Sequence, residues 1–396
     1  MPPTLQEFEA EVESFLDPWP IRGERSRFRW GVGSDDVSVF EESGAADARA
    51  ELDEVRAWRG QLAEAGLAWI TGPEEYGGRG LQRTFQARFD ALARRRAVPG
   101  SGPLTVSLGM VAPTILAHGT EAAKREYLAA MHAGAVVACQ LFSEPSAGSD
   151  LASVATRAER DGDRWRISGQ KVWTSGAHLA DIGEVLCRTS ENGRHANLTA
   201  FIVDMHQPGV IVRPLRQMTG GASFNEVCLD GAEVTDDRRL GEVDGGWRVA
   251  LTTLANERGA IGSGGFGGKG LLSLDRLSAL LRHTETVADP VIRQHVGHLV
   301  CGLRTAAWTR ARWTSSGQIA SHAPLLKLAL CRDLSALAGV VGAALGPELV
   351  ADSGDWGTYA WSRFVLGVPG YRIGGGTDEV LRSVIAERVL GLPKGP

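Results

Sequence analysis

The sequence predicts an α+β protein of several domains, in which helical regions precede and follow a region of β-strands. In the first third, apolar residues recur at helical spacing among acidic residues. Short β-rich runs then alternate with Asp-Gly and Asn-Gly pairs, which favour hairpins, before helical spacing returns. Helices that flank strands, rather than alternating with them, argue against a doubly wound sheet. The predicted domains are 1–134 (helical), 135–238 (β) and 239–396 (helical).

The composition is that of a globular chain and excludes several classes of protein. The 396 residues include 42 Lys and Arg against 47 Asp and Glu, a net charge of −5. Because a mildly acidic chain suits a phosphate backbone poorly, no nucleic-acid partner is expected. Without an unbroken apolar window of ~20 residues, no membrane span is expected. Glycine is unusually frequent: 50 of the 396 residues are glycine, more than one in eight, against an average of about 7%. This excess indicates either linkers or tight loops.

The cysteines indicate a reducing compartment. They are odd in number, widely spaced and form no CxxC pair, so neither a disulfide framework nor a metal site is predicted. The N-terminus, MPPTLQEFEAEVESF, lacks the basic start and apolar core of a signal peptide. A cytoplasmic enzyme is therefore expected. The five cysteines are Cys139, Cys187, Cys228, Cys301 and Cys331.

In the first domain, four helices are expected, with a turn-rich loop at Thr71–Gly80. The arginines of the third helix predict a solvated face, with binding of an anionic ligand as the alternative. In the second domain, three hairpin signals predict a small barrel or sandwich. The predicted helices of the first domain are 5–16, 48–65, 82–96 and 111–133, and the hairpin signals are Asp161-Gly162, Asn192-Gly193 and Asp230-Gly231.

The third domain is predicted to be helical from Gly245, through long Ala- and Leu-rich helices over 290–350, to a last helix at Asp378–Leu390. A GxGxxG pattern at 262–267 interrupts this helical spacing. A nucleotide fingerprint follows a strand and opens a helix, which this pattern does not. Close helix packing or a helix break is the favoured interpretation.

Two segments of the β-region carry groups suited to a ligand. ACQLFSEPSAGSDLA (Ala138–Ala152) predicts a strand running into a loop that offers hydroxyls and backbone N–H groups. SGQKVWTSGA (Ser168–Ala177) places Trp173 beside two hydroxyl residues, as a flat apolar wall next to hydrogen-bonding groups. A core tryptophan and ordinary turn serines are the alternative interpretation of either segment alone.

Together with five further segments, these two resemble the acyl-CoA dehydrogenase family over nearly the whole chain. The family's fold is an N-terminal helical domain, a central β-barrel and a C-terminal four-helix bundle, which agrees with the order of elements above. The further segments, in the family's order, are EEYGGRGL (74–81), HGTEAAKREYL (118–128), FNEVCLDGAEV, RLGEVDGGW and GGTDEVLRSVIAERVLGLPK.

The resemblance implies a tightly bound FAD. Ser149 would also lie near the thioester end of the acyl-CoA substrate. Independently, Gly374–Gly376 leads into Thr377, a good helix N-cap, where free N–H groups suit a phosphate or a polar flavin edge. The residues that match the family's flavin contacts are Gln140, Phe142, Ser143, Ser149, Trp173, Ser175, Thr377 and Glu379.

The implied reaction is α,β-dehydrogenation of an acyl thioester, in which a carboxylate removes the α-proton and a hydride passes to flavin N5. In many family members this glutamate directly precedes Gly-Thr in the loop before the last helix, where this chain has Gly375. A second family arrangement places it on the first helix of the C-terminal domain, where this chain has Glu257 followed by Arg258. Glu257 is therefore the candidate base and Arg258 a substrate-binding candidate; a surface glutamate is the alternative.

Some family features are absent. The Arg-x-x-Phe-Gly motif that reaches a neighbouring subunit's FAD is replaced by HTETV at 283–287, although Arg293 and Gln294 match a cofactor-binding pair further along. The Gln-x-x-Gly-Gly segment reads AALGP at 343–347, and Ile182-Gly183-Glu184 departs from an apolar strand. A homo-oligomer, dimeric or tetrameric, or a heteromer with a related subunit therefore remains open.

The expected partners are an acyl-CoA or a carrier-protein-bound acyl thioester, and an electron-transfer flavoprotein as electron acceptor. Two alternatives keep the fold. One is a non-catalytic FAD-binding subunit of a heteromeric dehydrogenase, against which Glu257 argues. The other is an oxidase or monooxygenase in which the flavin reacts with O₂.

Overall fold

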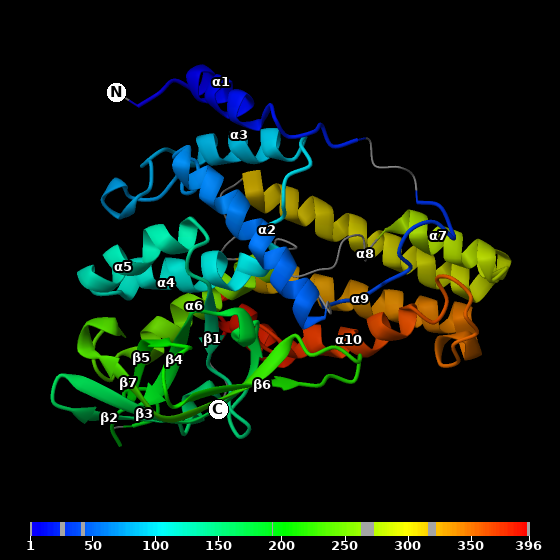
Figure 1. Cartoon of the computed structure of the whole chain (residues 1–396). Helices are drawn as coiled ribbons and strands as arrows, with labels where there is room; N and C mark the ends of the chain where they lie inside the picture. The colour runs from blue at the N-terminus through cyan, green and yellow to red at the C-terminus, as the bar shows by residue number, and fades with distance from the viewer. Residues whose placement is uncertain are drawn as a thin grey trace. The chain divides into compact units, whose positions relative to one another are not determined.

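The computed structural model of the chain describes residues 2–23, 28–40, 44–191, 193–262, 273–315 and 322–393. They form two compact units, each built from separate stretches of the chain (Figure 1). Residues 263–267 of the GxGxxG pattern lie outside the described residues. Unit 1 consists of Met1–Ser26, Ser43–Leu215 and Phe224–Thr253, and unit 2 of Arg27–Glu42, Arg216–Ser223 and Leu254–Pro396.

The helices of unit 1 precede its sheet in the chain. The first begins with a capping box, in which Thr4 Oγ accepts from the Glu7 N–H and the Glu7 carboxylate accepts from the Thr4 N–H. Its apolar face, including Phe8 and Val12, lies in a core shared with the next two helices. These helices are α1 (Leu5–Leu16), α2 (Ala45–Glu64), α3 (Arg83–Ala93), α4 (Ala112–His118) and α5 (Glu121–His132), with short 3₁₀ turns at Glu74–Tyr76 and Gly102–Leu104 and a π-helical segment, Ser107–Val111, that leads into α4.

The prediction of one helix over 111–133 is wrong. Helix α4 ends at His118 because Gly119 is extended and Thr120 starts a new helix. The Thr120 hydroxyl accepts from the Ala123 N–H at 3.1 Å, as an N-cap does. The chain thus turns between α4 and α5.

The middle of unit 1 is an eight-stranded sheet in the order β6-β7-β3-β2-β4-β5-β8, with β1 parallel to β4. The sheet is curled. Trp165 of β3 packs on Phe201 of β5, with ring centroids 5.2 Å apart, although two strands lie between β3 and β5 in the sheet. The strands are β1 (Ala138–Leu141), β2 (Arg157–Asp161), β3 (Arg164–Ser175), β4 (Ile182–Arg188), β5 (Leu198–Asp204), β6 (Val210–Leu215), β7 (Phe224–Thr235) and β8 (Arg239–Leu240).

Two of the three predicted hairpins form as antiparallel strand pairs, one of them through a longer loop than a two-residue turn. Strands β2 and β3 pair antiparallel directly across the turn at Gly162. The prediction for Asp230-Gly231 is wrong: these residues lie within β7, opposite Ser168 alone, and Gly231 has φ 68°. The pair therefore makes a bulge, which uses the same left-handed backbone as a turn. Strands β4 and β5 do pair antiparallel, but through the longer loop 189–197, and Asn192 lies outside the described residues.

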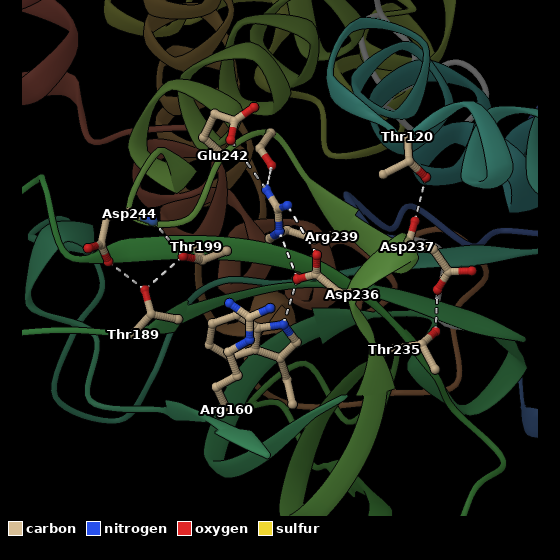
Figure 2. A network of polar contacts seen from close by, with 12 residues as sticks. Thr120, Arg160, Thr189, Thr199, Thr235, Asp236, Asp237, Arg239, Glu242 and Asp244 are labelled. Atoms are coloured by element: carbon tan, nitrogen blue, oxygen red, sulfur yellow. Dashed lines mark hydrogen bonds and ion pairs between the residues drawn. The ribbon is translucent and has the colours of Figure 1, made fainter. Parts of the chain in front are cut away.

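Helix α6 (Gly246–Gly262) starts at a polar network on this sheet (Figure 2). The Asp244 carboxylate accepts from the Thr189 hydroxyl at 2.7 Å, and the Asp244 N–H donates to Thr199 Oγ at 2.9 Å. Nearby, Asp236 accepts from both Trp165 Nε1 and Arg239. These bonds fix the point at which α6 leaves the sheet.

Unit 2 is a helical bundle. Its core includes Val37 and Val39 from the N-terminal stretch 28–40, which Arg276 binds through the Asp36 carbonyl. Helices α8 and α9 pack side by side, and α10 packs on α9 (Figure 1). After α6, its helices are α7 (Leu274–His283), α8 (Pro290–Ser315), α9 (Ala323–Leu345), α10 (Trp361–Ile373) and α11 (Asp378–Val384), with short 3₁₀ turns at Thr286–Ala288 and Gly346–Leu349 and a π-helical segment, Ile385–Val389, that continues α11.

Among the described helices, α9 with its following turn is one long and apolar enough to cross a membrane. Its apolar residues Leu334, Leu337 and Val341 are buried in the unit 2 core. Burial inside a bundle accounts for this apolar composition. The predicted order of a helical, a sheet and a second helical region is confirmed, and the five cysteines, all described, are free thiols.

Candidate functional site

The structure joins the two segments that the sequence selects as a ligand wall. The Lys171 ammonium of β3 donates to the Phe142 carbonyl at 3.1 Å and to Glu144 Oε1 at 2.8 Å, both in the loop after β1. The Val172 N–H donates to the Ser143 carbonyl at 2.9 Å. Phe142 and Ser143, which follow Gln140 of β1 by two and three residues, are thereby held beside the end of β3.

A buried ion pair is the centre of this junction. The side chains of Lys171 and Glu144 are 0% and 4% exposed. Glu144 also accepts from the backbone N–H groups of Ala155 at 2.6 Å and Thr156 at 2.9 Å. Burial alone would raise the pKa of Glu144, but Lys171 and these hydrogen bonds outweigh it and hold the pKa below its usual value. The loop is therefore fixed by an ionised carboxylate.

A bulge turns Trp173 outward. Lys171 pairs with Val227 and Thr174 with Asn225, so two residues of β3 oppose one of β7. Trp173 adopts φ 60°, an uncommon angle for a bulky residue, and its side chain is exposed. An aromatic ring placed in this way offers a flat face to a ligand.

The groups around Trp173 fit a flat ring with polar edges. The Thr174 hydroxyl is buried and has no hydrogen-bond partner in the described part of the chain. Ser143, Ser175 and Gln140 are half-buried, with one hydroxyl or amide each. An unpaired buried hydroxyl beside an exposed indole is consistent with a flavin ring. Ser149 lies further along the loop and is exposed.

In unit 2, the candidate base and its neighbour are half-buried on α6. The Arg258 Nε atom is buried and unpaired among the described residues. Burial lowers the pKa of Arg258, Glu257 opposes this shift, and Arg388 adds to it. A guanidinium with an unused donor, next to a carboxylate, suits an anionic or carbonyl group of a ligand.

The loop before α11 has a backbone that disfavours a glutamate. Gly375 has φ 68°, in the left-handed region, where other residues cost about 1–2 kcal/mol. The Lys327 ammonium holds the loop by donating to the Gly376 carbonyl at 2.7 Å. The predicted N-cap is confirmed, since Thr377 Oγ accepts from the Val380 N–H at 3.2 Å. Glu379 follows it and is exposed.

The remaining candidates, Arg293 and Gln294, are exposed in the first turn of α8. Of the predicted flavin contacts, the structure thus brings together those of β1 and β3 in unit 1. Those on α8 and α11 belong to unit 2.

Three consecutive family descriptions match the chain: "Acyl-CoA dehydrogenase, N-terminal domain" over residues 38–135, the middle domain over 139–232 and the C-terminal domain over 244–390. The chain belongs to the acyl-CoA dehydrogenase family. Members of this family are FAD flavoproteins and oxidoreductases, so the chain is an acyl-CoA dehydrogenase by family.

Among curated acyl-CoA dehydrogenases, the chain is 38% identical to IpdE1 of Mycobacterium tuberculosis over 98% of both chains. It is also 38% identical to FadE34 of the same organism, over 84% of this chain and 46% of FadE34. A solved structure described as "Tcur3481-Tcur3483 steroid ACAD" superposes with a TM-score of 0.71 at 26% identity, covering 100% of this chain and 99% of that one.

Sequence reasoning about this acyl-CoA dehydrogenase missed the groups that hold the site together. Lys171 and Glu144 lie in the two selected segments, and the opposite charges of the two segments were an available signal. Lys327 carried a similar signal as a lone charge within LLKLAL. Glu184 was noted only as a departure from an apolar strand, and the structure buries it completely.

Proposed function

We propose that this chain catalyses α,β-dehydrogenation of an acyl-CoA, with FAD as cofactor and Glu257 as the base that removes the α-proton. One observation carries the assignment of the base: Glu257 lies on α6, whereas position 375 holds a glycine with φ 68°. Bound FAD would supply the acceptor for the β-hydride. Arg258, beside Glu257, would bind or orient the thioester or the base.

In this proposal, Gln140, Phe142 and Ser143 line one side of the flavin, and Trp173 and Ser175 line the other. The exposed indole and the unpaired Thr174 hydroxyl support this arrangement. Ser149 would lie near the thioester end of the substrate. The other proposed flavin contacts are Thr377, Glu379, Arg293 and Gln294.

For the partner, we favour a heteromer with a related subunit. The departures at 283–287 and 343–347 remove family contacts that reach a neighbouring subunit's FAD. The similar steroid acyl-CoA dehydrogenase is named for two components together, which supports a two-component assembly and a polycyclic, steroid-derived acyl-CoA here. An electron-transfer flavoprotein is the proposed acceptor.

The test is an anaerobic panel of acyl-CoA thioesters, straight-chain, branched and steroid-derived, added to the purified FAD-loaded protein. We expect bleaching of the flavin absorbance by steroid-derived thioesters, because the substrate reduces the flavin. Bleaching only by straight-chain thioesters would contradict the proposed substrate class. No bleaching by any thioester, alone or with a related subunit, would indicate a non-catalytic FAD-binding chain. Rapid reoxidation of the bleached flavin by O₂ would instead indicate an oxidase.

A further inference from the structure

Glu184 is a buried acid that the proposed reaction does not use. It lies on β4 and is 0% exposed. Its neighbour Val185 faces the core inside the curled sheet, so Glu184 points to the opposite face. On that face, Glu184 Oε1 contacts Thr253 Oγ of α6 at 2.7 Å. The strand register places Gln140, a proposed flavin contact, directly beside it on β1.

The contact continues as a chain of hydroxyls. Thr253 Oγ lies 2.9 Å from Thr114 Oγ of α4, and Thr114 Oγ donates to the Met110 carbonyl at 2.8 Å. These atoms are buried and belong to unit 1. The chain therefore ties β4, α6 and α4 together at one point.

The number of protons available shows which protonation state of Glu184 allows every contact in this chain of hydroxyls to be a hydrogen bond. A hydroxyl carries one proton, and that of Thr114 goes to Met110. Thr253 must then donate either to Thr114 or, at 3.3 Å, to the Val249 carbonyl, and either choice leaves it no proton for Glu184. All three contacts are hydrogen bonds at once only if the carboxyl of Glu184 donates to Thr253.

The second oxygen supports the same form. Glu184 Oε2 is buried and has no hydrogen-bond partner among the described residues. Burying an oxygen without a hydrogen bond costs far less free energy when the acid is neutral than when it is an ionised carboxylate. Glu257 follows Thr253 by four residues, one turn along the same face of α6. A contact that holds Thr253 in place therefore also helps to position Glu257.

We propose that Glu184 is a positioning residue that stays protonated in the working enzyme and holds α6, and with it Glu257, by donating its proton to Thr253. The inference rests on the proposed role of Glu257. When Glu184 ionises, Thr253 turns its proton toward the carboxylate, and the contact with Thr114 loses its hydrogen bond. Proton abstraction by Glu257 then weakens.

The surroundings of Glu184 place this ionisation at mildly alkaline pH. Burial raises the pKa of Glu184 to about 8, and the hydrogen bond with Thr253 opposes the shift. No charged group contributes to this pKa shift. Glu184 lies beside Gln140 of β1 and Ile202 of β5 in the strand register and contacts Thr253 of α6, which in turn contacts Thr114 of α4. None of these four residues titrates. The titratable groups elsewhere on these elements are Cys139, His118, Asp204, Arg248, Glu257 and Arg258.

The experiment measures the rate of anaerobic flavin reduction by acyl-CoA between pH 6 and 9.5. The wild-type rate is expected to fall above pH 8, and Glu184→Gln to keep the neutral rate but lose this fall, because an amide donates to Thr253 and does not titrate. Glu184→Leu breaks the chain and is expected to slow reduction about tenfold at pH 7. Thr252→Val is the matched control, because Thr252 contacts His118 at 2.8 Å instead; its profile should follow the wild type.

A second readout does not depend on activity. Because the folded chain holds the proton to higher pH than the unfolded chain, stability is lost as pH rises through the interval from about 4.5 to about 8. The Tm of the wild type should therefore fall relative to Glu184→Gln across this interval and level off above it.

The outcomes separate this inference from the proposed function. An alkaline fall in rate that persists in Glu184→Gln, or a Tm difference that does not change with pH, would overturn the inference. A Glu184→Leu variant as fast as the wild type would also overturn it. If no acyl-CoA reduces the wild-type flavin, the proposed function fails, and the Tm comparison still decides whether Glu184 holds its proton.

Discussion

Glu144 and Glu184 are both buried in the sheet region of unit 1, but their surroundings favour opposite charge states. Glu144, after β1, receives the Lys171 ammonium and two backbone N–H groups. Glu184, on β4, has one hydroxyl contact and an unpaired oxygen. The pKa of Glu144 is accordingly lowered and that of Glu184 raised to about 8.

The comparison shows that burial by itself does not decide what a carboxyl does. Burial disfavours the charged form in both places. A cation and aligned amides reverse this preference at Glu144, which serves as a fixed anchor for a loop. Without them, Glu184 keeps a proton that it can donate. Three substitutions test this contrast.

The largest expected effect is at the anchor. Glu144→Leu leaves the Lys171 ammonium buried without its partner and two backbone N–H groups unpaired, so the free energy of unfolding should fall by about 3–5 kcal/mol. Urea denaturation at pH 7 measures it. The double variant with Lys171→Met should recover part of this loss. A loss below about 1 kcal/mol for Glu144→Leu would mean that the pair is not ionised.

The same substitution at Glu184 should be much milder. At pH 6 the acid is neutral, and Glu184→Leu removes one hydrogen bond, so the free energy of unfolding should change by no more than about 1.5 kcal/mol. The same denaturation experiment provides the comparison. A loss as large as that of Glu144→Leu would show that Glu184 is also charged, and the contrast would fail.

An exposed ion pair on the same sheet gives the smallest expected effect. Arg164 of β3 and Glu233 of β7 lie 3.1 Å apart, with both side chains about half exposed. Because water screens such a pair, Arg164→Met should lower the free energy of unfolding by roughly 0–1 kcal/mol. A loss above about 2 kcal/mol would show that burial is not what separates these pairs.

Local features of the fold could be predicted from the sequence, and non-local ones could not. The turn at Gly162 and the N-cap Thr377 depend on a few consecutive residues. The Asp230-Gly231 pair supplies the backbone angle of a turn, but the opposite strand makes it a bulge. The break before Thr120 has a local signal as well, Gly119 followed by an N-cap threonine, although the helical pattern on both sides predicted one helix.

The candidate site shows the same division between local features, which could be predicted, and tertiary contacts, which could not. The segments around Ser143 and Trp173 could be selected from residue types and from family resemblance. That Lys171 joins them is a tertiary contact between positions far apart in the chain. The role of Glu184 depends on which face of β4 it occupies and on which helix covers that face. Neither feature can be predicted from the adjacent residues in the sequence.

The most direct test of the account is Glu257→Gln. This variant keeps the shape of the side chain and removes the carboxylate, so FAD should remain bound while acyl-CoA no longer bleaches the flavin, with the rate falling at least about 10³-fold. Arg293→Gln, exposed on α8, should leave this first reduction much faster than in Glu257→Gln. Anaerobic stopped-flow absorbance of the FAD-loaded protein gives both rates. Undiminished bleaching by Glu257→Gln would contradict the assignment of Glu257 as the base.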